Sequence, residues 1–290
     1  MRFSIPDQYR GIACTLLAGF LFVAQDAVIK WMTGAYPTGE IMTIRGIIAL
    51  LFTGVLIWRQ GGIGVLRVTN GRLQLLRALT VVCTTVAFIS ALKYLPLATA
   101  MSVSFAGPLI VTAMAPRFLG EHVGWRRWSA VTVGFIGVIV IFRPGFGAMQ
   151  WVLLLPLGSA LLSAVRDITT RTLAGQDHPT GILFYALVAV TISGTATIPF
   201  GWVMPDLGDW YLFAITGVMV SLAQLFTIIA YRHAQVTTLA PFKYFSLIWG
   251  IGIGFAVWGD IPDSWTLAGS SLIIGSGLYI LHRERGRPSA

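Results

Sequence analysis

Seven ionisable side chains lie within long apolar stretches of the sequence: Asp26, Lys30, Arg45, Arg77, Arg166, Asp167 and Lys243. Charged groups are costly in an apolar environment, so they usually mark ion pairs or sites for polar ligands. Their chemistry is that of binding, because the sequence holds no Walker loop, zinc-ligand cluster or nucleophile elbow. No metal or cofactor is therefore expected, and we predict that the protein is not an enzyme.

Two acid–base spacings predict structural ion pairs. Asp26 and Lys30 are four residues apart, as are Asp167 and Arg171, and residues at this spacing meet on one face of a helix. Arg45 lies two turns into the next apolar stretch, close enough in depth to pair with Asp26. The alternative is that these side chains line a path for a substrate.

Arg166 and Lys243 are the candidates for substrate contact. Adjacent helical residues point about 100° apart, so Arg166 and Asp167 cannot both face one apolar surface. Lys243 follows Pro241, which is placed to weaken its helix and free a backbone carbonyl. A cation beside a broken helix suits a carboxylate, and the alternative is a lysine that reaches the cytoplasmic headgroups. Arg77, near the start of its stretch, is predicted to be interfacial.

The elements that position these groups follow from composition. Of the 290 residues, 56% are hydrophobic and 11% are charged, with a mean hydropathy of +0.79. An average soluble domain is about 25% charged. A soluble enzyme, a nucleic-acid binder and a disordered chain are thereby disfavoured. Cys14 and Cys83 lie in apolar runs and imply no disulfide framework.

The apolar runs predict an all-α polytopic membrane protein with ten transmembrane helices, since a span needs about 20 mostly apolar residues. The first run lacks an Ala-x-Ala-like cleavage site and is expected to be retained. No loop is long enough to fold into a soluble domain. The predicted spans are 10–34, 38–59, 72–94, 96–119, 125–143, 150–173, 180–203, 209–231, 236–258 and 264–282.

Basic residues predict the orientation, because they concentrate in cytoplasmic segments. With both termini inside, only Lys93 and Arg143 lie in outer connections. The inner segments hold Arg2, Arg10, Arg59, Arg67, Arg72, Arg117, Arg126, Arg127, Arg171, Arg232, Arg283, Arg285 and Arg287. The net charge of +9 thus describes topology and lipid contact, and no nucleic-acid partner is expected.

The chain repeats itself at an offset of about 140 residues. The stretch 18–30 matches 158–171, Pro37-Thr38-Gly39 matches Pro179-Thr180-Gly181, and Gly120-Glu121 matches Gly259-Asp260. Residues 1–145 and 146–290 are therefore predicted repeats of five helices each. An odd number of spans inverts the second repeat, an arrangement common in secondary transporters. A duplicated bundle without a transport role is the alternative.

The chain resembles EamA-type carriers of the drug/metabolite transporter superfamily over essentially its whole length. The residues that carry the resemblance are Arg45, the Ala-Leu-Lys-Tyr run ending at Tyr94, Ala106-Gly107-Pro108, Gly120-Glu121, Trp128, Gly134 and Gly137. Leu247, where the first half has Pro108, departs from the pattern. The resemblance implies a ten-helix carrier of the bacterial inner membrane, closest to amino-acid exporters.

Repeat symmetry predicts which side chains surround a central cavity. Thr85 and Phe88 match Gln224 and Thr227, and Met101 and Ser104 match Ala240 and Lys243. Such a cavity is mainly apolar with a few polar groups, as small-ligand sites are. The predicted cavity residues are Phe22, Thr85, Phe88, Met101, Ser104, Phe105, Ser163, Arg166, Gln224, Lys243 and Tyr244.

We therefore expect a secondary carrier that exports small metabolites, foremost amino acids including aromatic or apolar ones, by alternating access. One chain suffices mechanically, because both repeats lie in it. A drug or nucleotide-sugar-like carrier is the alternative within the superfamily. An integral-membrane enzyme acting on lipid-linked substrates is the alternative from another class.

Overall fold

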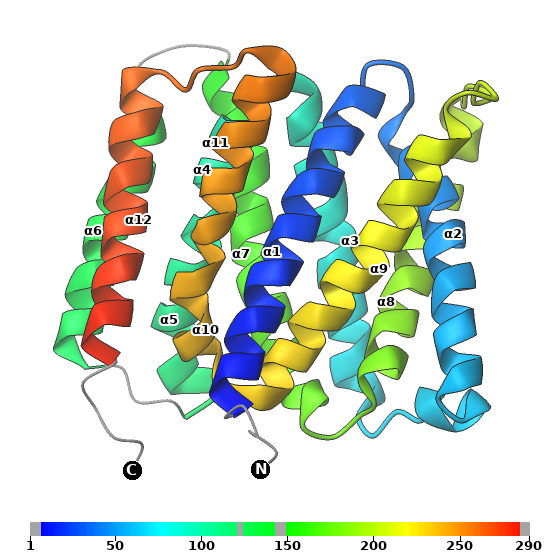
Figure 1. Ribbon diagram of the computed structural model, residues 1–290, viewed down its shortest axis with the longest axis horizontal. Coiled ribbons are helices and arrows are strands. Elements are labelled where there is room, and N and C mark those ends of the chain that lie inside the picture. Colours follow the sequence, from blue (N-terminus) through cyan, green and yellow to red (C-terminus); the bar gives the residue numbers. More distant parts are fainter. Residues whose placement is uncertain (1–6, 121–123, 143–148, 285–290) are drawn as a thin grey trace, which may run out of the picture.

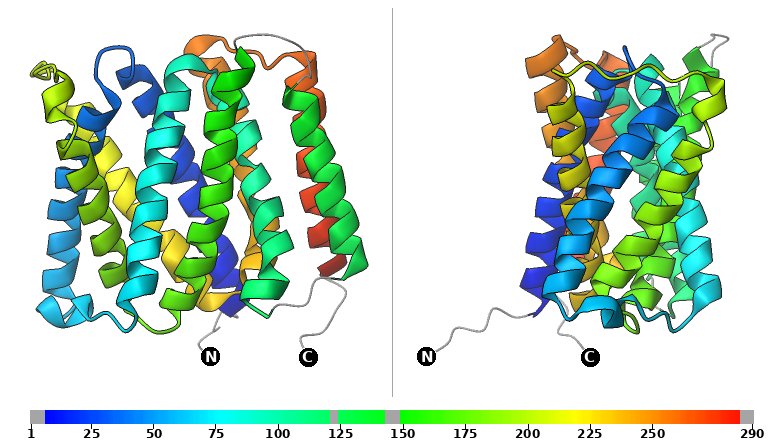
Figure 2. Two further views of the ribbon diagram at one scale, coloured as in Figure 1. Left: turned by 180° about the vertical axis from the view of Figure 1, so that it is seen from behind. Right: turned by 90° about the vertical axis from the view of Figure 1, so that its right-hand side faces the viewer.

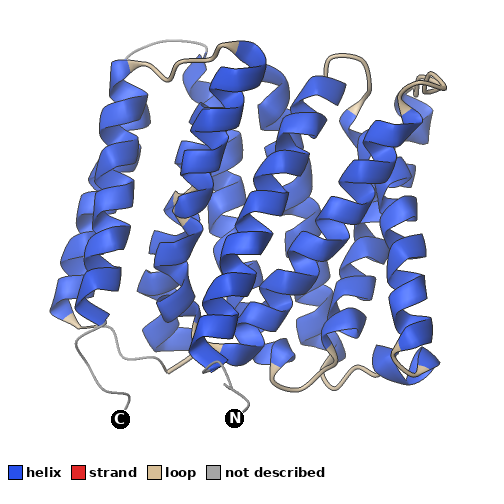
Figure 3. Cartoon of the chain, in the orientation of Figure 1, coloured by secondary structure: helices blue, strands red, loops and turns tan. Residues whose placement is uncertain are grey.

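Long apolar runs fold into helices because a helix satisfies its backbone hydrogen bonds internally, away from water. The computed structural model describes residues 7–120, 124–142 and 149–284, and within them it contains helices and no strand (Figure 3). The elements are α1 (Asp7–Met32), α2 (Thr38–Arg59), η1 (Gly62–Leu66), α3 (Gly71–Tyr94), α4 (Leu97–Ser104), α5 (Ala106–Phe118), α6 (Trp125–Phe142), α7 (Met149–Ala174), α8 (Pro179–Thr195), η2 (Ile198–Phe200), α9 (Trp210–His233), α10 (Val236–Lys243), α11 (Phe245–Trp258) and α12 (Ser264–Glu284).

Each predicted span coincides with one helix or with a pair of consecutive helices. Among the described residues, eight helical segments are long and apolar enough to cross a membrane, and Trp128–Phe142 is a shorter apolar helix. The all-α membrane class is therefore confirmed, whereas the tenfold crossing stays a prediction. α1 begins and α12 ends on the same side of the bundle (Figure 1), as an even number of crossings requires.

Two of the long segments are broken near their middle. α4 ends at Ser104 and α5 begins at Ala106, while α10 ends at Lys243 and α11 begins at Phe245. The breaks lie about 140 residues apart, at the offset of the predicted repeat. The second break forms although Leu247 stands where the first half has Pro108. A proline at that position is therefore not required for such a break.

The helices stand in two layers. Figure 2 shows α1 and α9 on one side and α3, α7 and α8 on the other. Glycines bring the helices close together: a Cβ atom on Gly11 of α1 would lie 3.1 Å from the Cβ of Ala234, just beyond α9. On Gly137 of α6 it would lie 2.6 Å from the carbonyl oxygen of Gly269 on α12. Small residues thus allow the close packing expected of membrane helices.

Charges separate between the two faces of the bundle, where the ends of the helices lie. α2 ends at Arg59 on the face where α1 begins, and Glu40 lies at the opposite face, where α2 begins (Figure 1). That the basic face is cytoplasmic stays a prediction. Several residues of the charge pattern lie outside the described residues: Arg2, Glu121, Arg143, Arg285 and Arg287.

Candidate functional site

A cavity of about 230 Å³ lies among helices of both layers. Its walls come from α1, α2, α3, α4, α5, α7, α9, α10 and α11. Of the eleven predicted cavity residues, ten line it: Phe22, Thr85, Phe88, Met101, Ser104, Phe105, Ser163, Arg166, Gln224 and Lys243. That these side chains bind a substrate stays a prediction.

Tyr244 is the eleventh, and it does not line the cavity. Its side chain is buried, with 2% of its surface exposed, and its ring packs against Phe105 with the centroids 5.6 Å apart. Tyr244 occupies the break between α10 and α11, which turns its ring into the packing between helices. Repeat symmetry identified the helix correctly but could not reveal this local turn.

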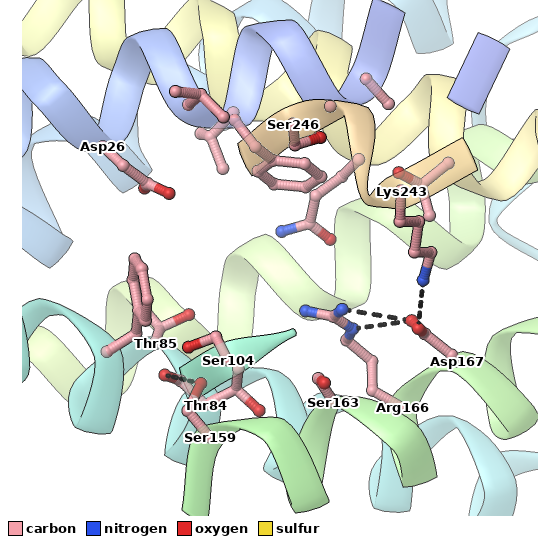
Figure 4. Close-up of a pocket in the computed structure, with 18 of the residues that line it drawn as sticks. Asp26, Thr84, Thr85, Ser104, Ser159, Ser163, Arg166, Asp167, Lys243 and Ser246 are labelled. Carbon is pink, nitrogen blue, oxygen red and sulfur yellow. Dashed lines mark hydrogen bonds and ion pairs between the residues drawn. The ribbon is translucent and has the colours of Figure 1, made fainter. Parts of the chain in front are cut away.

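The end of the cavity nearer the start of α1, here called the inner end, is built around Asp167 of α7. Arg166 donates through Nε and Nη2 to Oδ1 of Asp167 at 3.2 and 3.1 Å, and Lys243 Nζ lies 2.5 Å from Oδ2 (Figure 4). The lysine also donates to the hydroxyl of Tyr231 at 2.5 Å. The buried carboxylate of Asp167 therefore forms ion pairs with two cations from two helices.

The predicted Asp167–Arg171 pair is replaced by this arrangement. Arg171 donates instead to the backbone carbonyl of Tyr231. The reason is that Lys243, at the end of α10, reaches Asp167 from across the bundle. Sequence spacing within one helix could not reveal a partner on another helix.

The opposite, outer end of the cavity is built around Asp26 of α1. Gln25 donates through Nε2 to Oδ1 of Asp26 at 3.0 Å, and Arg45 of α2 donates through Nη1 to Oε1 of Gln25 at 3.3 Å. Asp26 and Arg45 both line the cavity. The predicted Asp26–Arg45 pairing is thus indirect, with an amide side chain between the two charges.

The predicted Asp26–Lys30 pair is also corrected. Lys30 Nζ lies 3.1 Å from Oδ2 of Asp260, donates to the carbonyl of Leu95 at 3.3 Å, and lies 4.9 Å from the ring centroid of Trp258. These partners lie around the outer end of α1, toward which the long lysine side chain extends. The structure therefore places Lys30 in contacts that join the two halves of the chain.

Arg77 of α3 was predicted to be interfacial, and this is wrong. Only 2% of its surface is exposed. It donates to Thr170 Oγ1 and to the carbonyl of Ile182, both at 2.9 Å, and to Oε1 of Gln224 at 3.4 Å. Its position near the start of an apolar run suggested headgroup contact, but α3 packs against α7 and α8 on this face.

Several polar cavity residues were missed by sequence reasoning. Thr84 lines the cavity with 8% of its surface exposed, and its hydroxyl has no hydrogen-bond partner among the described residues. Ser159, Gln25 and Tyr231 line it as well. Thr84 is next to the predicted cavity residue Thr85, and Gln25 is next to Asp26. Their position beside these residues is the sequence feature that could have identified them as cavity residues.

The comparisons with known proteins agree with this architecture. The profile of the EamA-like transporter family matches residues 9–143. A riboflavin transporter from Brucella anthropi is 30% identical over 274 residues, which cover 91% of this chain and 96% of that protein. The chain belongs to the EamA-like transporter family. The EamA-type carriers belong to the drug/metabolite transporter superfamily, as the sequence motifs predicted.

Other relatives of this EamA-family protein are also named transporters. The pseudopaline exporter of Pseudomonas aeruginosa is 28% identical, with 95% of this chain and 97% of that protein covered. The S-adenosylmethionine uptake transporter of Rickettsia conorii is 26% identical, with 98% and 97% covered. The protein is therefore a multi-pass membrane transporter, and the alternative of an integral-membrane enzyme acting on lipid-linked substrates is rejected.

A solved crystal structure confirms the fold of this EamA-family carrier. It matches 96% of this chain and 98% of its own with a TM-score of 0.74 at 20% sequence identity. A likeness at this identity speaks for the fold alone. The substrate must be argued from the cavity.

Proposed function

We propose that this carrier exports small zwitterionic metabolites, with aromatic and apolar amino acids as the first candidates, by alternating access through the central cavity. The observation that carries the proposal is the polarity of the cavity. Asp26 lies at its outer end with Arg45 beyond Gln25, and two cations, Arg166 and Lys243, surround the single carboxylate of Asp167 at its inner end (Figure 4). A carboxylate and a cation at opposite ends suit the amine and the carboxylate of one substrate.

The wall between the two ends supports an apolar or aromatic side chain on the substrate. Phe22, Phe88, Met101 and Phe105 supply apolar surface there, and serine and threonine hydroxyls supply a few hydrogen-bonding groups. Ligand sites are commonly apolar with a small number of placed polar groups. Hydrophobic contact then holds the side chain while the charged ends fix its orientation.

The size of the cavity favours a small metabolite. Its volume of about 230 Å³ lies just below the range of roughly 300–1,000 Å³ typical of pockets for drug-sized ligands. An amino acid is smaller than a drug-sized ligand, whereas a flavin or a nucleotide sugar is not.

The two helix breaks support alternating access. The first break adjoins Ser104 and Phe105, the second follows Lys243, and all three residues line the cavity. Helices that are interrupted at a midplane site, in two inverted repeats, are typical of secondary transporters. Rocking of one repeat against the other at these breaks would open the cavity to either side. The outward direction is supported by the resemblance to exporters.

Reconstitution into liposomes tests the proposal. Labelled phenylalanine, leucine and tyrosine are expected to show saturable flux that protein-free liposomes lack. An applied pH gradient distinguishes proton-coupled transport, which the gradient accelerates, from facilitated diffusion, which it leaves unchanged. Counterflow with the protein inserted in both orientations compares the two directions. Absence of saturable flux for every amino acid would refute the substrate class.

Riboflavin is the second candidate substrate. Two relatives, at 29% and 30% identity, are named riboflavin transporters. The same liposomes loaded with riboflavin test it, because flavin fluorescence reports release directly. Saturable riboflavin flux without amino-acid flux would replace the first proposal by the second.

A further inference from the structure

The charges around the cavity do not balance. Among the described residues, four cations lie at the depth of the cavity, namely Arg45, Arg77, Arg166 and Lys243, while the carboxylates there are Asp26 and Asp167. At the outer end, Asp26 is matched by Arg45 through Gln25. At the inner end, one carboxylate faces three cations.

We propose that the inner end is an anion-binding site, so that an anionic group is obligatory in the substrate and the amine is dispensable. The proposal rests on the proposed function and deepens it, because it states which end of a zwitterion contributes the affinity. The anion is a carboxylate or a phosphate-type group, since both match the guanidinium of Arg166.

The excess of positive charge at the inner end is costly because Arg77 is buried. An uncompensated charge inside a protein costs several kcal/mol, and a guanidinium does not lose its proton to escape that cost. Arg77 is 2% exposed, and its described partners are the neutral groups of Thr170, Ile182 and Gln224. These satisfy its hydrogen bonds but leave its charge in place. Arg77, Arg166 and Asp167 line one small cavity of about 20 Å³, so the fields of two cations exceed that of one carboxylate there.

Arg166 is the group that can contact the anion. Its Nε and Nη2 are used on Asp167, and its Nη1 makes no hydrogen bond to the described residues. Figure 4 shows its guanidinium reaching into the middle of the hollow, between Asp167 and Lys243 on one side and Ser104 and Thr84 on the other. The unpartnered hydroxyl of Thr84 offers the anion a further donor across the cavity. Arg77 acts through its charge and is a positioning residue.

The outer end of the cavity does not require an amine in the substrate. Asp26 receives a hydrogen bond from Gln25 and lies in the field of Arg45, so its charge is already compensated before any amine arrives. Removing the amine from a substrate therefore loses a contact but exposes no uncompensated carboxylate. Removing the carboxylate leaves the inner cations without an anion.

A matched series of ligands separates the two demands. Phenylalanine carries both groups, 3-phenylpropionate only the acid, 2-phenylethylamine only the amine, and 2-phenylethylphosphonate a phosphate-type acid. Binding is measured by thermal stabilisation of the whole purified protein in detergent, which does not depend on flux. The acid is expected to bind within about threefold of phenylalanine, and the amine at least tenfold more weakly. The phosphonate arm distinguishes a carboxylate site from a phosphate site.

The outcomes separate this proposal from the proposed function. Equal binding of amine and acid, or an acid more than tenfold weaker than phenylalanine, overturns the anion site even if amino acids are transported. Stabilisation by the acid without any amino-acid flux keeps the anion site and removes the proposed function. Stabilisation by none of the four compounds overturns the anion site.

Variants at Arg77 test the electrostatic mechanism without touching the ligand contact. Arg77→Gln is expected to weaken acid binding by about five- to tenfold and to leave amine binding unchanged or stronger. Arg77→Lys, which keeps the charge, is expected to restore the acid preference. Arg59→Gln, an exposed position at the end of α2, serves as the matched control. Acid preference unchanged in a folded Arg77→Gln protein would contradict the role of Arg77; should that variant not fold, the ligand series on the unmodified protein decides.

Discussion

The two ends of the cavity are built on positions that match in the predicted repeat, but they differ in charge. Asp26 and Asp167 occupy matching places in the predicted repeats. Asp26 reaches its cation through the amide of Gln25, whereas Asp167 contacts Arg166 and Lys243 directly. If the two halves are the repeats that the sequence predicts, the acidic position is kept in both, and the residues around it determine whether it pairs directly or through an amide.

The difference can be traced to single residues. Gln25 of the first half corresponds to Arg166 of the second, and Ser104 corresponds to Lys243. Two neutral side chains in one half are therefore cations in the other. Arg45 supplies the compensating cation of the first half from a neighbouring helix. The two ends of the cavity therefore differ in charge, although the predicted repeat would make them similar.

Neutralising Arg166 is the largest perturbation that this comparison suggests. Arg166→Gln is expected to lower transport in liposomes at least a hundredfold, because it removes the cation that reaches the middle of the cavity. Gln25→Arg, which gives the first half the charge of the second, is expected to slow transport by a smaller factor. Wild-type flux in a folded Arg166→Gln protein would show that the two ends are functionally alike.

Neutralising Asp167 and Asp26 one at a time compares how much each carboxylate contributes to the free energy of unfolding. Asp167→Asn is expected to reduce the free energy of unfolding by about 3 kcal/mol, since it leaves two partly buried cations, Arg166 and Lys243, without their shared partner. Asp26→Asn also leaves the buried Arg45 without its carboxylate, but it is expected to cost less, about 1–2 kcal/mol, because the asparagine still accepts the hydrogen bond from Gln25 and Arg45 keeps its bond to that amide. Denaturant titration in detergent measures both. Equal costs would mean that both ends rely on direct ion pairing.

The sequence predicted well those features that depend on local periodicity, namely the positions of the long helices and the residues that face the cavity. Apolar runs predicted the position of every long helix among the described residues, although they did not predict the short helix Gly62–Leu66. The repeat pointed to ten residues that line one cavity. Both predictions depend on spacing along the chain. The break at Tyr244 follows Pro241 by three residues, close to where a weakened helix was expected. Even Arg45 and Asp26 were predicted at similar depth from counting turns.

What the sequence could not give is the choice of partner across helices. Lys30 and Asp26 have ideal spacing within a helix, yet Lys30 contacts Asp260, far along the chain. Arg77 is near the start of α3, but the packing of α3 against α7 and α8 buries it. Long side chains such as these reach several partners, and only the packing of the helices selects one.

The ion pair between Lys30 and Asp260, near the outer end of α1, is expected to make a smaller contribution to stability. A double-mutant cycle of Lys30→Met and Asp260→Asn is expected to give a coupling of about 0.5–1 kcal/mol, because the pair is partly exposed to solvent. Thermal or denaturant unfolding in detergent measures it. Trp258→Leu, which removes the ring beneath the lysine, should lower stability without changing that coupling. A coupling near zero would assign the junction to helix packing alone.

The smallest effect concerns Tyr36, in the outer connection between α1 and α2. Its hydroxyl donates to Asp209 at 2.6 Å, and this hydrogen bond raises the pKa of Tyr36 above its ordinary value of 10.0. A raised pKa in the folded state means a contribution to stability that is complete below pH 10 and is lost as the pH rises through the folded value. The difference in melting temperature between wild type and Tyr36→Phe should therefore shrink above pH 10. A difference independent of pH would assign the contribution of Tyr36 to the packing of its ring against Phe213.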